Sequence, residues 1–315
     1  MELDVQVVRE LTIDPASHPR GVGYVSAASG LVRVGDRYCV IADDEQHLAV
    51  FECGAATPGR LIRIFDGDLP ASPKRRKAAK ADLEAIAVLP AHPSCRHGAV
   101  LAIGSGSRPR RERAVLIGID EVGGLTPTSH RIDLAPLYRT LRSRLGALNI
   151  EGAFACGDAF ILLQRGNQAL SNACIRYALD DFVGWCVDPQ GSAPTPDSIE
   201  IMDLGTAQGV PLTFTDGASV GDGSWVFSAV AERTSDSYLD GGCVAAAVGL
   251  VGTDGTPRVV RRIRPLWKIE GIEVQPFEGA LHVTMTTDAD DPALPSKLLA
   301  GTLELDRMKP ARPSG

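Results

Sequence analysis

Four acidic residues recur in similar contexts along the chain and are the first candidates for chemistry. Each opens an apolar stretch, and the four residues are Glu84, Glu151, Asp216 and Glu270. A degenerate fifth copy carries Ser29 in place of the acid. Carboxylates that converge on one place repel one another, so they share protons, pair with bases or bind a cation. We therefore predict that these four acids bind a divalent cation, Ca²⁺ in preference to Mg²⁺. The simpler alternative is that each acid accepts backbone N–H bonds at its own turn.

Three residues have the side chains of a general acid or base. Glu151 and Glu270 are carboxyl groups that are also predicted metal ligands, and His47 carries an imidazole that titrates near neutral pH. The alternative for His47 is a solvated position at the tip of a strand.

Charged residues also stand where the second strand after each repeated segment is expected to end. One side of the expected channel mouth is basic, with Arg108, Arg165 and Arg233, and the other is acidic, with Asp288. Asn167 adds an amide. Arginine forks suit an anionic group, so these five residues are predicted to bind a small anionic molecule. They are alternatively solvated, or paired with the four acids.

The repeat that carries these residues predicts an all-β protein. Its period of about 54–67 residues matches one four-stranded propeller blade of about 40–50 residues plus loops. The count is five blades, and six if one merged blade is divided. Residues 5–13 have no partner in their own repeat, so they are expected to close the last blade as its outer strand. The chain is then a single domain over residues 1–306 with a disordered tail at 307–315.

Helical periodicity is confined to short segments. Apolar residues recur at helical spacing between Leu134 and Leu148, just before Glu151. This predicts a helix that lies over the channel mouth, and residues 74–84 are a shorter equivalent.

Composition narrows the function classes. Hydrophobic residues make up 44% and charged residues 23%, and the net charge of −7 argues against a nucleic-acid partner. No segment has the length and apolar character of a signal peptide or a membrane span. The seven cysteines lack metal-binding spacing and indicate a reduced, cytoplasmic protein. The oligomeric state is left open.

The openings of the repeats resemble those of bacterial propeller families that begin successive blades with an acidic residue and glycine. The esterase-like phytase group is one of them. The matching pairs are Glu84-Ala85, Glu151-Gly152, Asp216-Gly217 and Glu270-Gly271, where Ala85 departs from the glycine. The resemblance implies a calcium-assisted hydrolase or a ligand-binding propeller.

Together these features predict a metal-assisted hydrolase or lyase that acts on a small anionic metabolite at the channel mouth. The alternative is a propeller that binds a ligand or a protein without catalysis, because a fold alone implies no activity.

Overall fold

The computed structural model describes residues 2–233 and 242–305 and shows a mostly β protein. The predicted tail at 307–315 lies outside the described residues. Three separate sheets have four strands each, in sequence order. Their strands are β2 (Ala28–Val34), β3 (Arg37–Ala42), β4 (His47–Glu52) and β5 (Arg60–Arg63); β6 (Leu83–Leu89), β7 (Ala99–Gly104), β8 (Arg113–Ile119) and β9 (Leu125–Asp133); and β10 (Ile150–Cys156), β11 (Ala159–Gln164), β12 (Asn172–Ala178) and β13 (Ser198–Met202).

A fourth sheet of eight strands has the order β16-β17-β18-β19-β1-β22-β21-β20. Its members are β16 (Thr213–Ser219), β17 (Trp225–Glu232), β18 (Cys243–Val251), β19 (Pro257–Arg264), β1 (Glu2–Glu10), β22 (Lys297–Glu304), β21 (Ala280–Thr287) and β20 (Ile269–Phe277). A small hairpin of β14 (Thr206–Ala207) and β15 (Val210–Pro211) precedes β16. The eight-stranded sheet is thus two consecutive four-stranded groups joined edge to edge.

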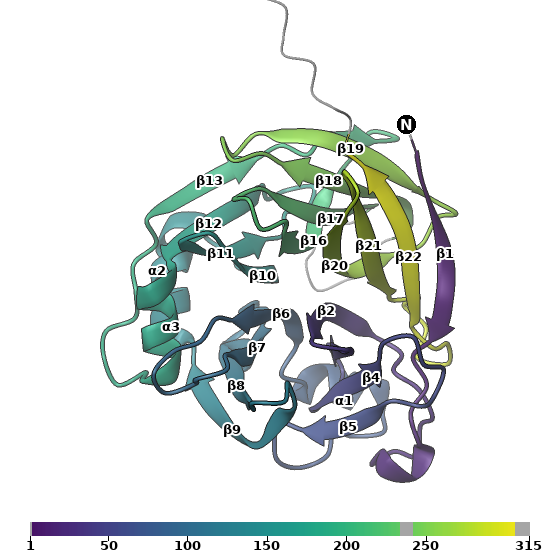
Figure 1. Ribbon diagram of the computed structural model, residues 1–315, viewed down its shortest axis with the longest axis vertical. Helices are drawn as coiled ribbons and strands as arrows, with labels where there is room; N and C mark the ends of the chain where they lie inside the picture. Colours follow the sequence, from purple (N-terminus) through teal and green to yellow (C-terminus); the bar gives the residue numbers. More distant parts are fainter. Residues whose placement is uncertain (1, 234–241, 306–315) are drawn as a thin grey trace, which may run out of the picture.

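The sheets surround a common centre (Figure 1). The strand nearest the centre is β2, β6, β10, β16 or β20, and each of these packs against the next in a closed ring. The apolar core lies between neighbouring sheets, because separate buried clusters fill each gap. This arrangement explains continuous apolar strands such as β11, whose six residues are all buried.

The N-terminal strand β1 joins the two groups of the eight-stranded sheet. It pairs antiparallel with β22 and parallel with β19. Its bounds, Glu2–Glu10, differ from the expected 5–13 because Ile13 forms only an isolated bridge with Gly59. The pairing leaves β22 and β19 without exposed edges, which limits edge-to-edge aggregation.

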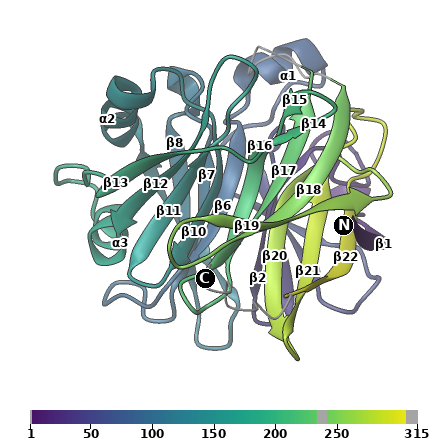
Figure 2. The same ribbon diagram turned by 90° about the horizontal axis from the view of Figure 1, so that it is seen from above.

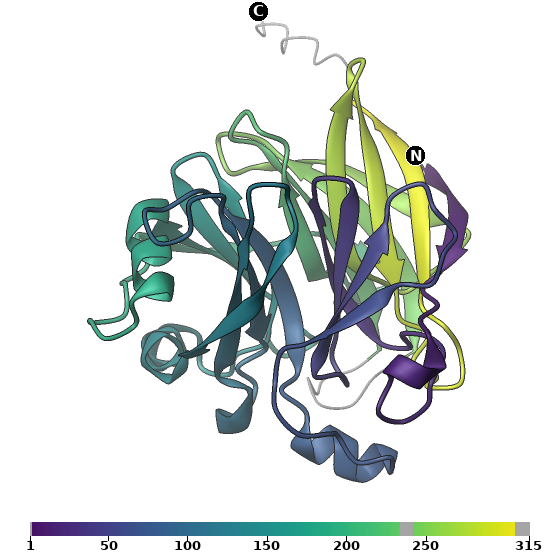
Figure 3. The same cartoon turned by 60° about the horizontal axis from the view of Figure 1, so that its bottom comes forward.

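Of the three α-helices among the described residues, α1 (Pro73–Ala79) and α2 (Ala135–Leu145) lie where the sequence pattern indicates helix, and α3 (Leu179–Val187) does not. Figures 2 and 3 show α1 projecting from one end of the ring, the end that we call the mouth. The α2 helix packs at the periphery instead of over the channel, with the Tyr138 hydroxyl donating to the Gly104 carbonyl at 2.6 Å. No helix among the described residues is long and apolar enough to cross a membrane.

Candidate functional site

A bulge near the start of each innermost strand positions the side chains at the mouth. In each of these strands one residue is skipped in the pairing with the next strand. The skipped residues are Ser29, Glu84, Glu151, Thr215 and Glu270. A bulge turns its extra residue out of the ladder and so re-aims the side chain.

Asp216 is therefore one residue out of step with the other predicted acids. Thr215 occupies the bulge in β16, and Asp216 stands where β10 and β20 have Gly152 and Gly271. Its buried carboxyl group accepts hydrogen bonds from the Gly217 and Ile272 backbone N–H groups, at 2.8 and 3.0 Å. Asp216 thus joins two strands and does not line the cavity.

The other three predicted acids line one cavity of about 110 Å³ at the mouth. Among the described residues, eight acidic and five basic side chains surround it. They are Asp43, Asp82, Glu84, Glu151, Glu232, Glu270, Asp288 and Asp290, with Lys77, Lys80, Arg111, Arg165 and Lys268. Ten of these thirteen side chains form two clusters of five.

The first group, which we call the Arg165 cluster, consists of Glu151, Arg165, Glu232, Lys268 and Glu270. The Arg165 guanidinium lies 3.2 Å from Glu151, 2.6 Å from Glu232 and 3.8 Å from Glu270. The Lys268 ammonium lies 3.3 Å from both Glu232 and Glu270. Glu151 comes from β10, and Glu232 and Glu270 come from β17 and β20 of the eight-stranded sheet, so the cluster ties together two sheets that share no backbone ladder.

Burial dominates the electrostatics of this cluster. It raises the pKa of Glu151 to about 8, against the opposing effect of Arg165, and Glu270 raises it further. The pKa of Glu270 is also raised by burial, although Lys268 and Arg165 oppose the shift. Three carboxyl groups share two cations here, so the cluster favours retaining one proton.

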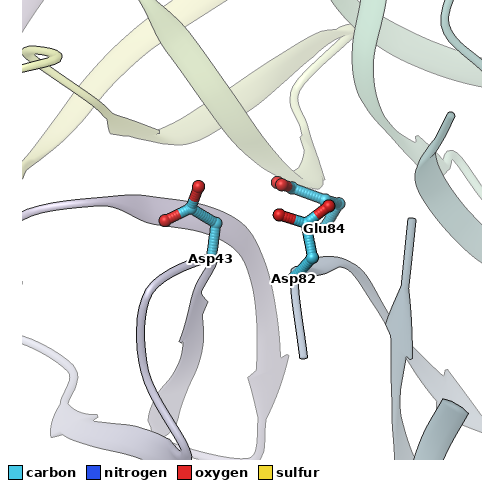
Figure 4. A group of neighbouring side chains, drawn as sticks. All are labelled: Asp43, Asp82 and Glu84. Atoms are coloured by element: carbon cyan, nitrogen blue, oxygen red, sulfur yellow. The ribbon is translucent and has the colours of Figure 1, made fainter. Parts of the chain in front are cut away.

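The second group, which we call the Glu84 cluster, consists of Asp43, Lys80, Asp82, Glu84 and Arg111. Figure 4 shows its three carboxyl groups converging from two neighbouring segments. One oxygen of each carboxyl group lies within 4.8 Å of the other two. The Lys80 ammonium pairs with Asp43 and lies 2.8 Å from Asp82, whose other oxygen lies 2.6 Å from Arg111.

Asp82 is held in a strained conformation. It is buried and has a φ of 58°, in the left-handed region that side chains other than glycine rarely adopt. Its carboxylate also accepts a hydrogen bond from the Ser105 hydroxyl. Strain of this kind persists only where the surrounding contacts impose it, and it is concentrated at functional sites.

Glu84 differs from every other member of its cluster. Among the described residues its carboxyl group has no hydrogen-bond or ion-pair partner, although it lines the cavity. Burial raises its pKa well above the ordinary value, and the charges of Asp82, Glu151 and Asp43 add to the shift. Its raised pKa thus favours the protonated form of Glu84, whose carboxyl group lines the cavity.

The other predicted site residues divide between the cavity and its surroundings. Asn167 and Asp288 line the cavity, whereas Arg108 and Arg233 are exposed residues outside it. Burial raises the pKa of Asp288 to about 8, against Lys268. His47 is buried elsewhere, with Nδ1 3.7 Å from Glu45, and does not line the cavity.

A spacing of two residues is the signal that could have found the missed residues. Lys80 stands two residues before Asp82, and Asp82 two residues before Glu84, in the segment that leads into β6. The same spacing relates Lys268 to Glu270. Glu232 ends β17 and lines the cavity, one residue before the predicted ligand-binding residue Arg233.

Comparisons with solved structures show the fold alone. The catalytic domain of the Coprinopsis cinerea GH62 α-L-arabinofuranosidase is 13% identical with a TM-score of 0.53, and the match covers 96% of this chain and 97% of that one. A mannose phosphorylase of Leishmania mexicana is 10% identical with a TM-score of 0.45, covering 95% of this chain and 89% of that one.

Sequence comparison gives a family but no activity. No curated protein matches the chain. The resemblance to esterase-like phytases stays a prediction. The model of a family of unknown function, DUF6929, matches residues 24–303, and the chain belongs to this family.

Proposed function

We propose that the cavity at the mouth is the active site of a hydrolase that uses carboxyl groups as acid and base on a small polar substrate. The observation that carries this proposal is Glu84, a carboxyl group with a raised pKa and no partner at the cavity wall. A general acid needs a proton near neutral pH and access to the reacting bond. Glu84 meets both requirements.

Asp43 is the partner carboxylate that the geometry supports best. It lines the same cavity, its side chain is 26% exposed, and one of its oxygens lies within 4.8 Å of Glu84. Carboxyl groups this close leave no room for a water between them, so Asp43 serves as the nucleophile. In the proposed first step Glu84 gives its proton to the leaving-group oxygen while the Asp43 carboxylate attacks the carbon at which that bond breaks. Glu84 then takes a proton from the water that displaces Asp43, which restores both groups. A lyase would use the same pair to remove and deliver a proton.

The substrate class follows from charge. The cavity has more acidic than basic side chains, and the Arg165 guanidinium is already engaged by three glutamates. An anionic group would have to displace those glutamates, which disfavours the anionic metabolite expected from the sequence. Hydroxyl groups can donate to the same carboxylates without charge repulsion. We therefore favour a neutral, hydroxyl-rich substrate such as a glycoside.

Glu84→Gln tests the proposal because it keeps the shape and removes the titrating proton. We expect turnover of 4-nitrophenyl glycosides to fall by about 10²–10⁴-fold, with an unchanged melting temperature. Glu304→Gln, at an exposed position on β22, is the matched control and should keep full activity. Equal turnover by Glu84→Gln and wild type would contradict the assignment of the acid.

A cation-assisted version of this function rests on one observation, the convergence of Asp43, Asp82 and Glu84. Calcium takes six to eight oxygen ligands. Here the Lys80 ammonium already pairs with two of the three carboxylates, and Arg111 pairs with the second oxygen of Asp82. We therefore propose that lysine, rather than calcium, balances these charges.

We also infer that the ring comprises five blades, with β1 as the outer strand of the last one. The support is the closed ring of innermost strands and the order β20-β21-β22-β1. A binding propeller without catalysis is the alternative function. Asp216 fits it, since its carboxyl group serves a strand junction, whereas the unpartnered Glu84 does not. The cytoplasmic location stays a prediction.

A further inference from the structure

A second cavity of about 380 Å³ adjoins the first. The two share a wall made of Lys268, Asp288 and Asp290. Two connections form the second cavity: the segment between β19 and β20, and the segment between β21 and β22. The first cavity alone is smaller than the roughly 300–1,000 Å³ of typical ligand sites, and the two together fall within that range.

The lining of the second cavity differs from that of the first. Leu266, Trp267, Leu294 and Pro295 contribute apolar surface. The side chains of Leu266 and Leu294 are 51% and 49% exposed, although both are large and hydrophobic. Grouped exposed apolar residues beside a polar site are typical of ligand-binding surfaces.

Trp267 adds an unmet hydrogen-bond donor. Its Nε1 is buried and has no partner among the described residues. A buried polar group without a partner costs about 1–3 kcal/mol, so such groups are uncommon and call for an explanation. Because Trp267 lines the second cavity, a small rotation of its indole would present this donor to a ligand acceptor there.

The shared wall is fixed in place. The Lys268 ammonium lies 2.6 Å from Asp290, in addition to its contacts in the Arg165 cluster. Asp290 has a φ of 54°, and its backbone N–H donates to Asp288 at 2.8 Å. The three shared residues thus lie at the junction of a carboxyl-rich cavity and one with more apolar surface, which suits a molecule with two unlike halves.

We propose that the second cavity binds the leaving-group half of the substrate, a ring with an apolar face and a hydrogen-bond acceptor. The inference rests on the proposed function of the first cavity. Aromatic and sugar rings both pack against an indole. The acceptor is the glycosidic oxygen that bears the ring or, in a sugar, a ring hydroxyl. The preferred substrate is therefore a glycoside with a second ring, rather than a free sugar or a methyl glycoside.

Fluorine NMR of protein labelled with 5-fluorotryptophan tests binding without turnover. The chain has three tryptophans, and Trp185 and Trp225 are buried in the core. Trp267→Phe assigns the Trp267 signal, and if that variant does not fold, Trp185→Phe and Trp225→Phe together assign it by elimination. Phenyl glycosides probe an aromatic ring, disaccharides a sugar ring, and methyl glycosides of the same sugars neither. We expect the first or second set to shift the Trp267 signal and the methyl set not to.

A surface variant measures the apolar contribution. Leu294→Ser should raise the dissociation constant of the ring-bearing probe about tenfold, because apolar burial is lost. Val122→Ser, which changes an exposed valine in the β8–β9 turn, should leave it unchanged. If no ring-bearing probe shifts the Trp267 signal, the inference is overturned, even if the probes are hydrolysed. A shift without hydrolysis supports the second cavity and contradicts the proposed function instead.

Discussion

The Glu84 cluster and the Arg165 cluster have the same inventory and different geometry. Each contains three carboxyl groups and two cationic side chains, so each holds one acid in excess of its bases. In the Arg165 cluster the excess proton falls on Glu151, which still contacts Arg165 and accepts from Asn149 at 2.5 Å. In the Glu84 cluster burial favours the protonated form of Glu84, which has no such partner among the described residues.

The difference separates a structural role from a chemical one. A protonated glutamate whose oxygens are engaged within the protein stabilises a junction between sheets, and donating its proton would disrupt that junction. A protonated glutamate that faces the cavity can donate to a substrate without breaking a protein contact. The contacts of the one carboxyl group in excess of the cationic side chains therefore indicate the role of a charged cluster better than its composition does.

Arg165→Met should have the largest effect on stability. Removing one partner of a buried ion pair leaves uncompensated charge and costs about 3–5 kcal/mol, here with three glutamates affected. Urea unfolding would show the loss. Arg233→Met, at an exposed position after β17, is the matched control and should stay within about 0.5 kcal/mol of wild type. A small effect of both variants would mean that the Arg165 cluster does not join the sheets.

The repeat made the fold predictable. The strands β11, β12 and β17 are apolar runs bounded by turns, which are a strong local signal in the sequence. The α3 helix was not expected, since its segment of nine residues is short and largely apolar. The number of blades stays an inference.

The site was predictable in part. The acid-glycine pairs do mark the mouth, but the glycine reports a close approach of strands: a Cβ on Gly271 would lie 2.9 Å from the Leu31 backbone nitrogen. Asp216-Gly217 imitates this pair one residue out of register, and a shift of one residue moves a side chain to the other face of a strand. The basic residues Lys80 and Lys268 stand two positions before Asp82 and Glu270, a spacing that the pattern of acids alone does not show.

The pH dependence of stability sharpens the comparison at Glu151. Burial raises its pKa in the folded state to about 8, whereas an unfolded glutamate titrates at about 4.3. The folded state therefore holds a proton that the unfolded state releases. The resulting stabilisation is complete below about pH 4.3 and is lost as the pH rises to about 8. Glu151→Gln cannot titrate and removes this contribution.

Melting curves of wild type and Glu151→Gln between pH 5 and 8 measure that contribution. We expect the melting temperature of the wild type to fall by at least about 2–4 °C relative to that of the variant across this range. A shift of this size corresponds to about 1 kcal/mol in proteins of about 150–250 residues, which are somewhat smaller than this one. Glu304→Gln, on the exposed end of β22, should follow the wild type. Parallel curves for wild type and Glu151→Gln would place the excess proton of the Arg165 cluster on another carboxyl group.

Calcium should have the smallest effect on the wild type and a larger one on a single variant of the Glu84 cluster. A ligand that binds only the folded state stabilises it by about 2.7 kcal/mol at one hundred times its dissociation constant. In the wild type the Lys80 ammonium stands between Asp43 and Asp82, so calcium and a chelator should both leave the melting temperature unchanged.

Lys80→Met removes that cation and leaves three crowded carboxyl groups, so calcium should raise the melting temperature of this variant. Lys268→Met, the equivalent change in the Arg165 cluster, should not gain the response, because the Arg165 guanidinium still contacts all three glutamates there. Stabilisation of the wild type by calcium would instead favour the cation-assisted function.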